Sequence, residues 1–180
     1  MAKTRLLLLD ADVVLTAHEL GIWEQLKVKY EIAVPATIIR EARYFKSQTG
    51  NKSINLQIQI DAGEISCLEA TAGELLAAFN NFTNSFLAGI DDGEKEGIAL
   101  IHCGRAPGYA FCTGDTNAIE AIGMLDLGNS SISFEEVALG AGLGIKSVRP
   151  SMGRKAHAEH VKKGRDRRIS GECFIKSPLI

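Results

Sequence analysis

Short apolar runs alternate along this chain with longer segments in which apolar residues recur at helical spacing. The clearest run, Leu6 to Leu9, is continuous, as in parallel strands that are buried on both faces. Such alternation is typical of a parallel sheet covered by helices, so we expect an α/β fold, a three-layer sandwich with a central, mainly parallel sheet. The expected strands cover residues 5–9, 31–34, 65–68, 110–113 and 132–134, and the expected helices cover residues 13–30, 36–45, 71–82, 91–102, 116–125 and 135–143.

The segment between residues 47 and 60 departs from this alternation. Residues 47–53 are polar and include Gly50, which predicts a loop. In residues 54–60, apolar and polar residues alternate strictly, which predicts a half-exposed strand at a sheet edge. Gly21 argues against one unbroken helix over residues 13–30.

The apolar runs are too short for a membrane protein. A membrane span needs roughly 20 apolar residues, and no run approaches that length. The leucines after the basic start of the chain are too few for the core of a signal peptide. The cysteines lie far apart without a CxxC pair and are interpreted as buried thiols in a reducing compartment. We therefore expect a cytoplasmic protein with no membrane association.

Acidic residues follow two of the expected strands. Asp10 comes directly after the first strand, and Asp115 comes two residues after the strand that ends at Thr113. Each aspartate taken alone is also a normal helix cap. Ligands of open α/β sheets collect at the carboxyl ends of the strands, so parallel pairing would bring both carboxylates to one edge.

Two further acidic positions lie in expected helices. Glu41 is placed beside the apolar face of its helix, and Asp92 and Glu96 are four residues apart and share a helix face. A solvated helix face is the alternative explanation for each. Carboxylates that converge from several segments repel one another unless a cation joins them. Hard oxygen ligands suit Mg²⁺ or Mn²⁺, which activate water for phosphodiester hydrolysis, so we expect such a site.

Four motifs, taken in order over residues 5–140, resemble those of the PIN-domain family of small metal-dependent ribonucleases. They are LDADVVL (9–15), VPATIIRE (34–41), GEKEGIAL (93–100), which is similar to the GExEAIxLA form of the family, and FCTGD (111–115). The resemblance implies a parallel sheet flanked by helices and a Mg²⁺ or Mn²⁺ cofactor. It also implies RNA hydrolysis by an activated water, which leaves a 5′-phosphate and a 3′-hydroxyl.

The resemblance also assigns roles to single residues. At the third acidic position Glu96 matches best, with Asp92 and Glu94 as competitors. The catalytic and metal-binding set is Asp10, Glu41, Glu96 and Asp115, with Asp92 as a further metal ligand and Thr113 as a supporting hydroxyl. Many small members of the family are toxins paired with an antitoxin, so the expected partners are an RNA substrate, an antitoxin protein and a second copy of the chain.

Positive charge is concentrated at the end of the chain. Residues 1–145 carry 19 acidic and 10 basic residues, whereas residues 146–180 carry 3 and 10. Apolar periodicity fades after Pro150, so we expect a PIN-like catalytic domain over residues 1–149 and a basic tail over residues 150–180. The tail is interpreted either as an RNA-docking arm or as a solvated terminus. Its clustered basic residues are Arg154, Lys155, Lys162, Lys163, Arg165, Arg167 and Arg168.

Two other functions fit parts of the sequence. Asp10-Ala-Asp12 resembles the DxD loop of haloacid-dehalogenase phosphatases, in which Asp10 would be the nucleophile and Asp12 the acid and base. That resemblance gives Glu41 and Glu96 no role. The second alternative is a non-catalytic scaffold that binds RNA or protein and keeps the fold without the metal.

Overall fold

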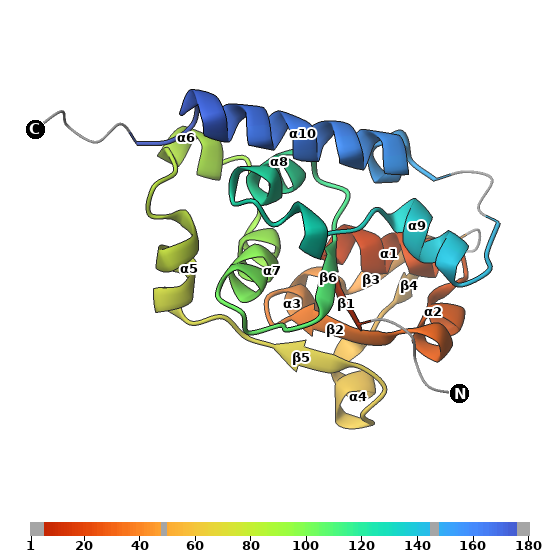
Figure 1. Ribbon diagram of the computed structural model, residues 1–180. Coiled ribbons are helices and arrows are strands. Elements are labelled where there is room, and N and C mark those ends of the chain that lie inside the picture. The colour runs from red at the N-terminus through yellow and green to blue at the C-terminus, as the bar shows by residue number, and fades with distance from the viewer. Residues whose placement is uncertain (1–5, 48–49, 145–147, 176–180) are drawn as a thin grey trace, which may run out of the picture.

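The central sheet of the computed structural model is parallel and has the strand order β5-β2-β1-β6 (Figure 1). The structure describes residues 6–47, 50–144 and 148–175. The strands are β1 (Leu6–Leu9), β2 (Glu31–Pro35), β5 (Ser66–Leu68) and β6 (Tyr109–Cys112). From β1 the chain adds strands in one direction as far as β5, and then returns to place β6 on the other side of β1. The topological switch point therefore lies between β1 and β6.

Both faces of the sheet are buried, which confirms the three-layer α/β sandwich. Leu7 and Leu9 on β1 face one apolar core, and Leu8 between them faces the other. The helices with side chains in the first core are α1 (Ala11–Glu19), α2 (Trp23–Lys29), α3 (Ile38–Glu41), α4 (Leu56–Asp61) and α9 (Phe134–Gly140). The second core receives side chains from α5 (Ala72–Phe79), α6 (Asn84–Leu87), α7 (Asp92–His102) and α8 (Thr116–Met124).

Helix starts and breaks follow local sequence signals. Gly21 adopts a φ of 68° and separates α1 from α2, as its position in the helical segment predicted. Thr71 and Glu74 form the reciprocal capping box that opens α5. Asp91 caps α7 and Asp115 caps α8. These helices match the expected ones to within a few residues.

The helix expected over residues 36–45 is wrong in its second half. Only Ile38–Glu41 is helical, and the chain then forms an antiparallel hairpin of β3 (Tyr44–Ser47) and β4 (Gly50–Ser53). The hairpin also replaces the loop expected over residues 47–53. The ring of Phe45 lies 5.3 Å from the ring of His18 on α1. If the helix continued to residue 45, the Phe45 side chain would point elsewhere and this contact would be lost, which explains why the helix ends early.

The edge strand expected over residues 54–60 is also wrong. Residues Leu56–Asp61 form helix α4, and the Asn55 side chain caps it by accepting the N–H of Ile58 at 3.2 Å. An i, i+2, i+4 pattern contains an i, i+4 pair that shares one helix face. Leu56 is accordingly 2% exposed and Ile60 packs on the core, whereas the middle residue, Ile58, is 63% exposed.

The last expected strand, at residues 132–134, is reduced to a single parallel bridge between Ser131 and Phe111 of β6. The N–H of Ile132 donates to the carbonyl of Phe111 at 3.0 Å. Ser133 then caps α9 with a capping box, so the chain turns into a helix before a ladder can form. A short 3₁₀ segment, Gly128–Ser130, precedes the bridge.

The segment expected as a tail contains a packed helix. Residues Pro150–Met152 form a 3₁₀ turn, and α10 (Arg154–Ser170) follows and lies along α8 (Figure 1). Gly123 on α8 and Gly164 on α10 face each other, because a Cβ on either would overlap the backbone of the other helix. Within the described residues, no helix is long and apolar enough to cross a membrane.

Gly164→Ala is expected to lower the free energy of unfolding by about 1–3 kcal/mol, because the added Cβ overlaps the carbonyl of Glu120. Gly73→Ala in α5 is the matched control, since its Cβ would meet only the Thr71 hydroxyl at 3.9 Å. The control should be neutral or stabilising. Thermal melting of both variants checks this, and equal melting temperatures would contradict the close approach of α8 and α10.

Candidate active site

An open pocket of about 760 Å³ lies at the carboxyl ends of β1 and β6, at the topological switch point. Acidic side chains dominate its lining, and of the described residues that line it only Lys95 is basic. Its acidic residues are Asp10, Asp12, Glu41, Asp91, Asp92, Glu94 and Asp115. The sheet edge predicted from the sequence is thus where acidic residues of separate segments meet.

Asp10 is the most deeply buried of these acids, with 3% of its surface exposed. It follows β1 directly and accepts the N–H of Ala11 at 2.6 Å, so the same residue ends the strand and caps α1. Burial raises the pKa of Asp10 from 3.8 to about 7, because a carboxylate removed from water loses solvation. Without a cation, Asp10 is therefore costly to ionise.

Thr113 links Asp10 to Glu94. Its hydroxyl oxygen lies 3.1 Å from Oδ2 of Asp10 and 3.4 Å from Oε1 of Glu94, and it accepts the N–H of Asp115 at 3.1 Å. A hydroxyl has one proton to donate, so it satisfies one of the two carboxylates at a time. Thr113 therefore lies between the two buried carboxyl groups, and its supporting role stays a prediction.

Glu94 is the buried acid that α7 contributes to the pocket. It is 6% exposed, and its Oε2 accepts the N–H of Asp91 at 3.0 Å in the capping box that opens the helix. Burial, followed by the nearby charges of Asp10 and Asp115, raises the pKa of Glu94 from 4.5 to about 9. The pocket thus holds two buried carboxyl groups that resist ionisation together.

Glu41 reaches the pocket from the end of α3. A Cβ at Gly93 would lie 2.8 Å from its Oε2, so the glycine lets this carboxylate approach the first turn of α7. Burial raises the pKa of Glu41, and the charges of Asp91 and Asp92 raise it further. Glu41 is exposed at the surface, so it forms the rim of the pocket and Asp10 its floor.

Glu96, the best sequence match at the third acidic position, lies outside the pocket. It is 5% exposed, and its two oxygens accept the N–H of Thr37 at 2.8 Å and the N–H of Ala70 at 3.0 Å. It thereby ties α7 to the chain after β2 and β5. Glu94, kept as a competitor in the sequence, lines the pocket together with Asp92. Successive residues turn by about 100° around a helix, so Glu94 and Glu96 point in nearly opposite directions.

Glu96→Ala is expected to lower the free energy of unfolding by about 1–3 kcal/mol, because two backbone N–H groups lose their acceptor. Glu69→Ala removes the same side chain at an exposed neighbouring position and should change stability little. Melting curves of the two variants check this. A Glu96→Ala protein that melts like wild type but loses catalytic activity would show instead that Glu96 is a ligand.

The chemistry of the donor set fits a hard divalent cation, because carboxylates and one hydroxyl meet without a balancing cation at the pocket floor. The side chains are not converged on one point, however. In the described ranges, no group of three or more histidine, cysteine, aspartate or glutamate side chains is gathered as a bound metal would hold them. Of the expected metal ligands, Asp10, Glu41, Asp92 and Asp115 line the pocket, together with the competitor Glu94.

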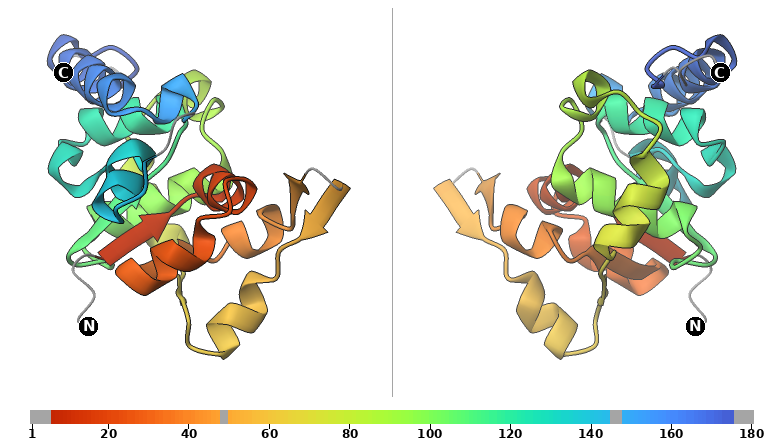
Figure 2. Two further views of the ribbon diagram at one scale, coloured as in Figure 1. Left: turned by 90° about the vertical axis from the view of Figure 1, so that its right-hand side faces the viewer. Right: turned by 90° about the vertical axis from the view of Figure 1, so that its left-hand side faces the viewer.

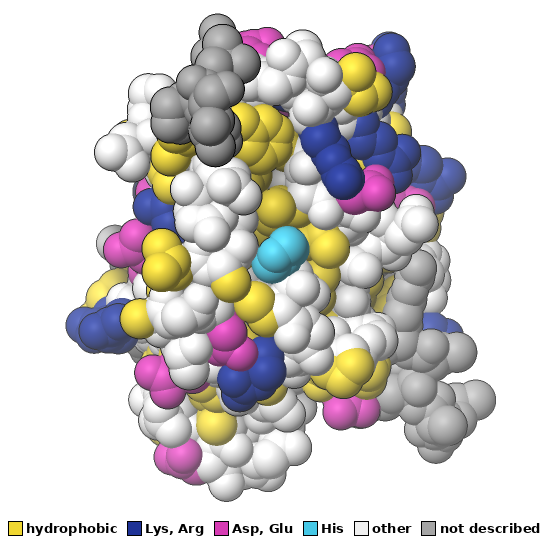
Figure 3. All heavy atoms as spheres, turned by 60° about the vertical axis from the view of Figure 1, so that its left-hand side comes forward, with side chains coloured by type: hydrophobic (Ala, Val, Ile, Leu, Met, Phe, Trp, Pro, Cys, Tyr) yellow, Lys and Arg dark blue, Asp and Glu magenta, His cyan; other side chains and the backbone are white. Residues whose placement is uncertain are grey.

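The basic residues expected to contact RNA along α10 have acidic partners within this chain. Lys163 and Arg167 lie 2.8 and 2.6 Å from the carboxylate of Glu120, which is 2% exposed. Figure 3 shows Lys and Arg side chains with Asp or Glu side chains among them at this end of the molecule. The other pairs are Arg154–Glu136, Lys155–Glu159, Lys162–Asp166, Arg165–Asp126 and Arg168–Asp126, with N–O distances of 3.3–4.0 Å.

Sequence reasoning ranked Glu94 below Glu96, although one signal favours Glu94. Asp91-x-x-Glu94 is a capping box, which turns the glutamate back toward the start of its helix. The start of α7 is the end that faces the pocket, so the capping box indicates that Glu94 is the acidic residue that points into it. Asp12, which also lines the pocket, is bound by Arg149 at 3.0 Å.

The fold and the pocket define an α/β protein with an acidic site at the switch point of a parallel sheet. No family model and no curated protein matches the chain.

Proposed function

We propose that this protein is a metal-dependent ribonuclease of the PIN type, with its site in the acidic pocket. The observation that carries the proposal is the pair of buried carboxyl groups, Asp10 and Glu94, on one hydroxyl at the switch point. Both acids also cap helices, but capping does not require them to lie beside each other, and buried acids with raised pKa values cluster at ligand-binding sites. The order of the four PIN-like motifs supports the same function.

In this mechanism Asp10, Glu94 and Asp115 would hold Mg²⁺ or Mn²⁺, with Glu41 at the rim. When bound, the cation supplies Lewis acidity that lowers the pKa of water and stabilises charge on the phosphate. Thr113 donates to Asp10 and fixes its orientation. Lys95, on the rim beside Asp92, is positioned to contact a phosphate of the substrate.

The pocket favours a nuclease over the phosphatase alternative. A phosphatase of that type needs Asp12 to transfer protons, but both its oxygens lie 3.0–3.2 Å from the guanidinium of Arg149. It also leaves Glu94 and Glu41 without a role in the same pocket. The antitoxin and the second copy of the chain stay predictions that rest on the resemblance.

The direct test is cleavage of an end-labelled single-stranded RNA by purified protein with Mn²⁺, with Mg²⁺ and with EDTA. We expect cleavage only with a divalent cation, and products with a 5′-phosphate and a 3′-hydroxyl. Cleavage that persists in EDTA, or 2′,3′-cyclic phosphate ends, would contradict the mechanism. An intact RNA under every condition would favour the non-catalytic scaffold.

A further inference from the structure

The β3–β4 hairpin projects from the body of the protein (Figure 2). Its strands pair with each other and with no strand of the central sheet. The ring of Phe45 on β3 packs against that of His18 on α1 and holds the hairpin to the body. Glu41 on the rim of the pocket lies three residues before Tyr44, so their Cα atoms are at most about 10 Å apart.

The hairpin and the residues next to it are basic, although the domain as a whole is acidic. Residues 40–55 carry four of the ten basic residues of residues 1–145, against one acid, Glu41. These bases, Arg40, Arg43, Lys46 and Lys52, are all exposed. In the described part of the chain, no ion pair holds any of the four within 4.0 Å, in contrast to the paired bases of α10.

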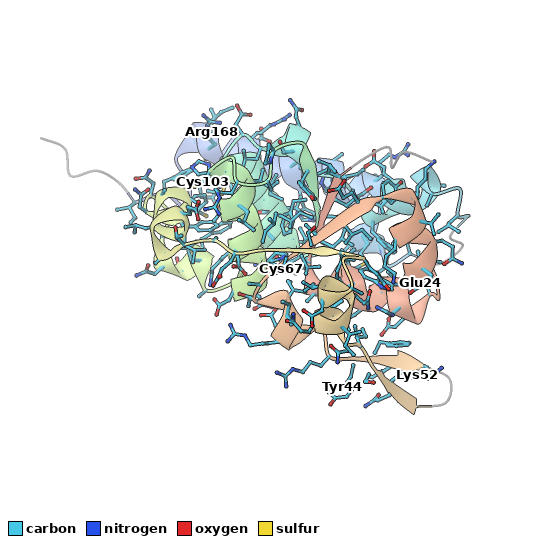
Figure 4. All side chains as sticks on the ribbon, turned by 90° about the horizontal axis from the view of Figure 1, so that it is seen from below. Glu24, Tyr44, Lys52, Cys67, Cys103 and Arg168 are labelled. Carbon is cyan, nitrogen blue, oxygen red and sulfur yellow. The ribbon has the colours of Figure 1, made fainter. Side chains whose placement is uncertain are left out.

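An exposed aromatic side chain accompanies these charges. Tyr44 is 63% exposed, and strand alternation places it on the same hairpin face as Lys46. A cleft of about 280 Å³ lies beside it, and Arg43 and Asn55 contribute to the lining of that cleft. Figure 4 shows Tyr44 and Lys52 on the hairpin, at the opposite side of the molecule from Arg168 on α10.

We propose that the hairpin and the residues just before it bind the single-stranded RNA substrate through Arg40, Arg43, Tyr44, Lys46 and Lys52 and lead it into the acidic pocket. This inference rests on the proposed function. An acidic pocket repels a polyanion, so a nuclease needs unpaired positive charge close to the site. Unpaired cations with an exposed aromatic ring are the groups that contact the backbone and stack on the bases of a single strand.

The binding test uses a fluorescein-labelled, 20-nucleotide single-stranded RNA in EDTA, so that cleavage cannot occur. We expect Arg43→Ala/Lys46→Ala/Lys52→Ala to weaken binding at least about tenfold and to reduce the salt slope of log affinity by about 2. Tyr44→Ala should weaken it about fivefold or more. Lys29→Ala is the control for the loss of an exposed lysine outside the hairpin, and this variant should bind RNA like wild type.

Mn²⁺-dependent hydrolysis of bis(p-nitrophenyl) phosphate separates this inference from the proposed function, because that diester is too small to reach the hairpin. Loss of RNA binding by the triple variant with unchanged diester hydrolysis supports the hairpin. A triple variant that binds RNA like wild type overturns the hairpin and leaves the nuclease standing. Displacement of RNA by poly-glutamate as readily as by unlabelled RNA would also overturn it, because the face would then bind any acidic chain.

Discussion

Asp10→Asn is expected to reduce Mn²⁺-dependent RNA cleavage by at least about a hundredfold. Loss of an outer-shell partner of a metal ligand already costs 10- to 100-fold, and Asp10 is proposed as a direct ligand. Asparagine keeps the size of the side chain and one oxygen, which can still accept the N–H of Ala11, while its NH2 group replaces the oxygen that faces the hydroxyl of Thr113. The change therefore removes the negative charge and leaves the cap of α1 in place. Initial rates on labelled RNA at saturating Mn²⁺ measure the effect.

Asp12→Asn, tested beside Asp10→Asn, distinguishes a nuclease from a phosphatase. Asp12 lines the same pocket but is bound to Arg149, so a nuclease should lose less than about tenfold when it changes. A phosphatase that uses Asp12 as acid and base would lose as much as with Asp10→Asn. Cleavage by Asp10→Asn at the wild-type rate would remove the metal-site interpretation.

Most of the fold follows from local signals. The apolar run of β1 is buried on both sides whatever its partners are, and the capping residues Thr71 and Asp91 begin their helices by bonds to the next turn. Four parallel strands separated by helices can be connected in only a few ways, because such crossovers are right-handed and do not cross each other. The α/β sandwich was therefore predictable from one sequence.

The segments that failed are those in which tertiary contacts choose between local alternatives. The alternation in residues 54–60 satisfies a strand, but Leu56 and Ile60 satisfy a helix face equally well, and the side chain of Asn55 caps the helix. Residues 36–45 favour a helix until Phe45 packs on His18. His18 lies 27 residues before Phe45, so this contact is not recognisable from spacing along the chain.

The pocket was predictable in its outline but not in its third acid. Asp10 and Asp115 follow strands, so the strand ends position them without further information. The choice between Glu94 and Glu96 depends on which backbone groups surround α7, here the N–H groups of Thr37 and Ala70. The packing of α10 was not predictable for a similar reason, because Lys163 and Arg167 meet Glu120, an acid buried on α8 that carries no marker in the sequence.

The buried acids also predict how the metal-free protein responds to pH. Glu94 has a pKa of about 9 in the folded protein, against an ordinary value of 4.5, and that of Asp10 is about 7 against 3.8. Below about pH 3 both groups are protonated in both states and cost nothing. As the pH rises, the unfolded chain ionises first, so the free energy of unfolding falls until the folded pKa values are passed.

Between pH 6 and pH 9 in EDTA, Glu94 should therefore cost wild type on the order of 3 kcal/mol, since one pKa unit corresponds to 1.36 kcal/mol. For a chain of this length, that is a fall of about 6–12 °C in melting temperature. Glu94→Gln cannot ionise and should lose much less over the same range. Mn²⁺ should raise the melting temperature of wild type more at pH 9 than at pH 6, because it binds ionised carboxylates. If the melting temperatures of wild type and Glu94→Gln fall equally with pH, ionisation of Glu94 does not destabilise the folded protein. That result would contradict a cation site between Asp10 and Glu94.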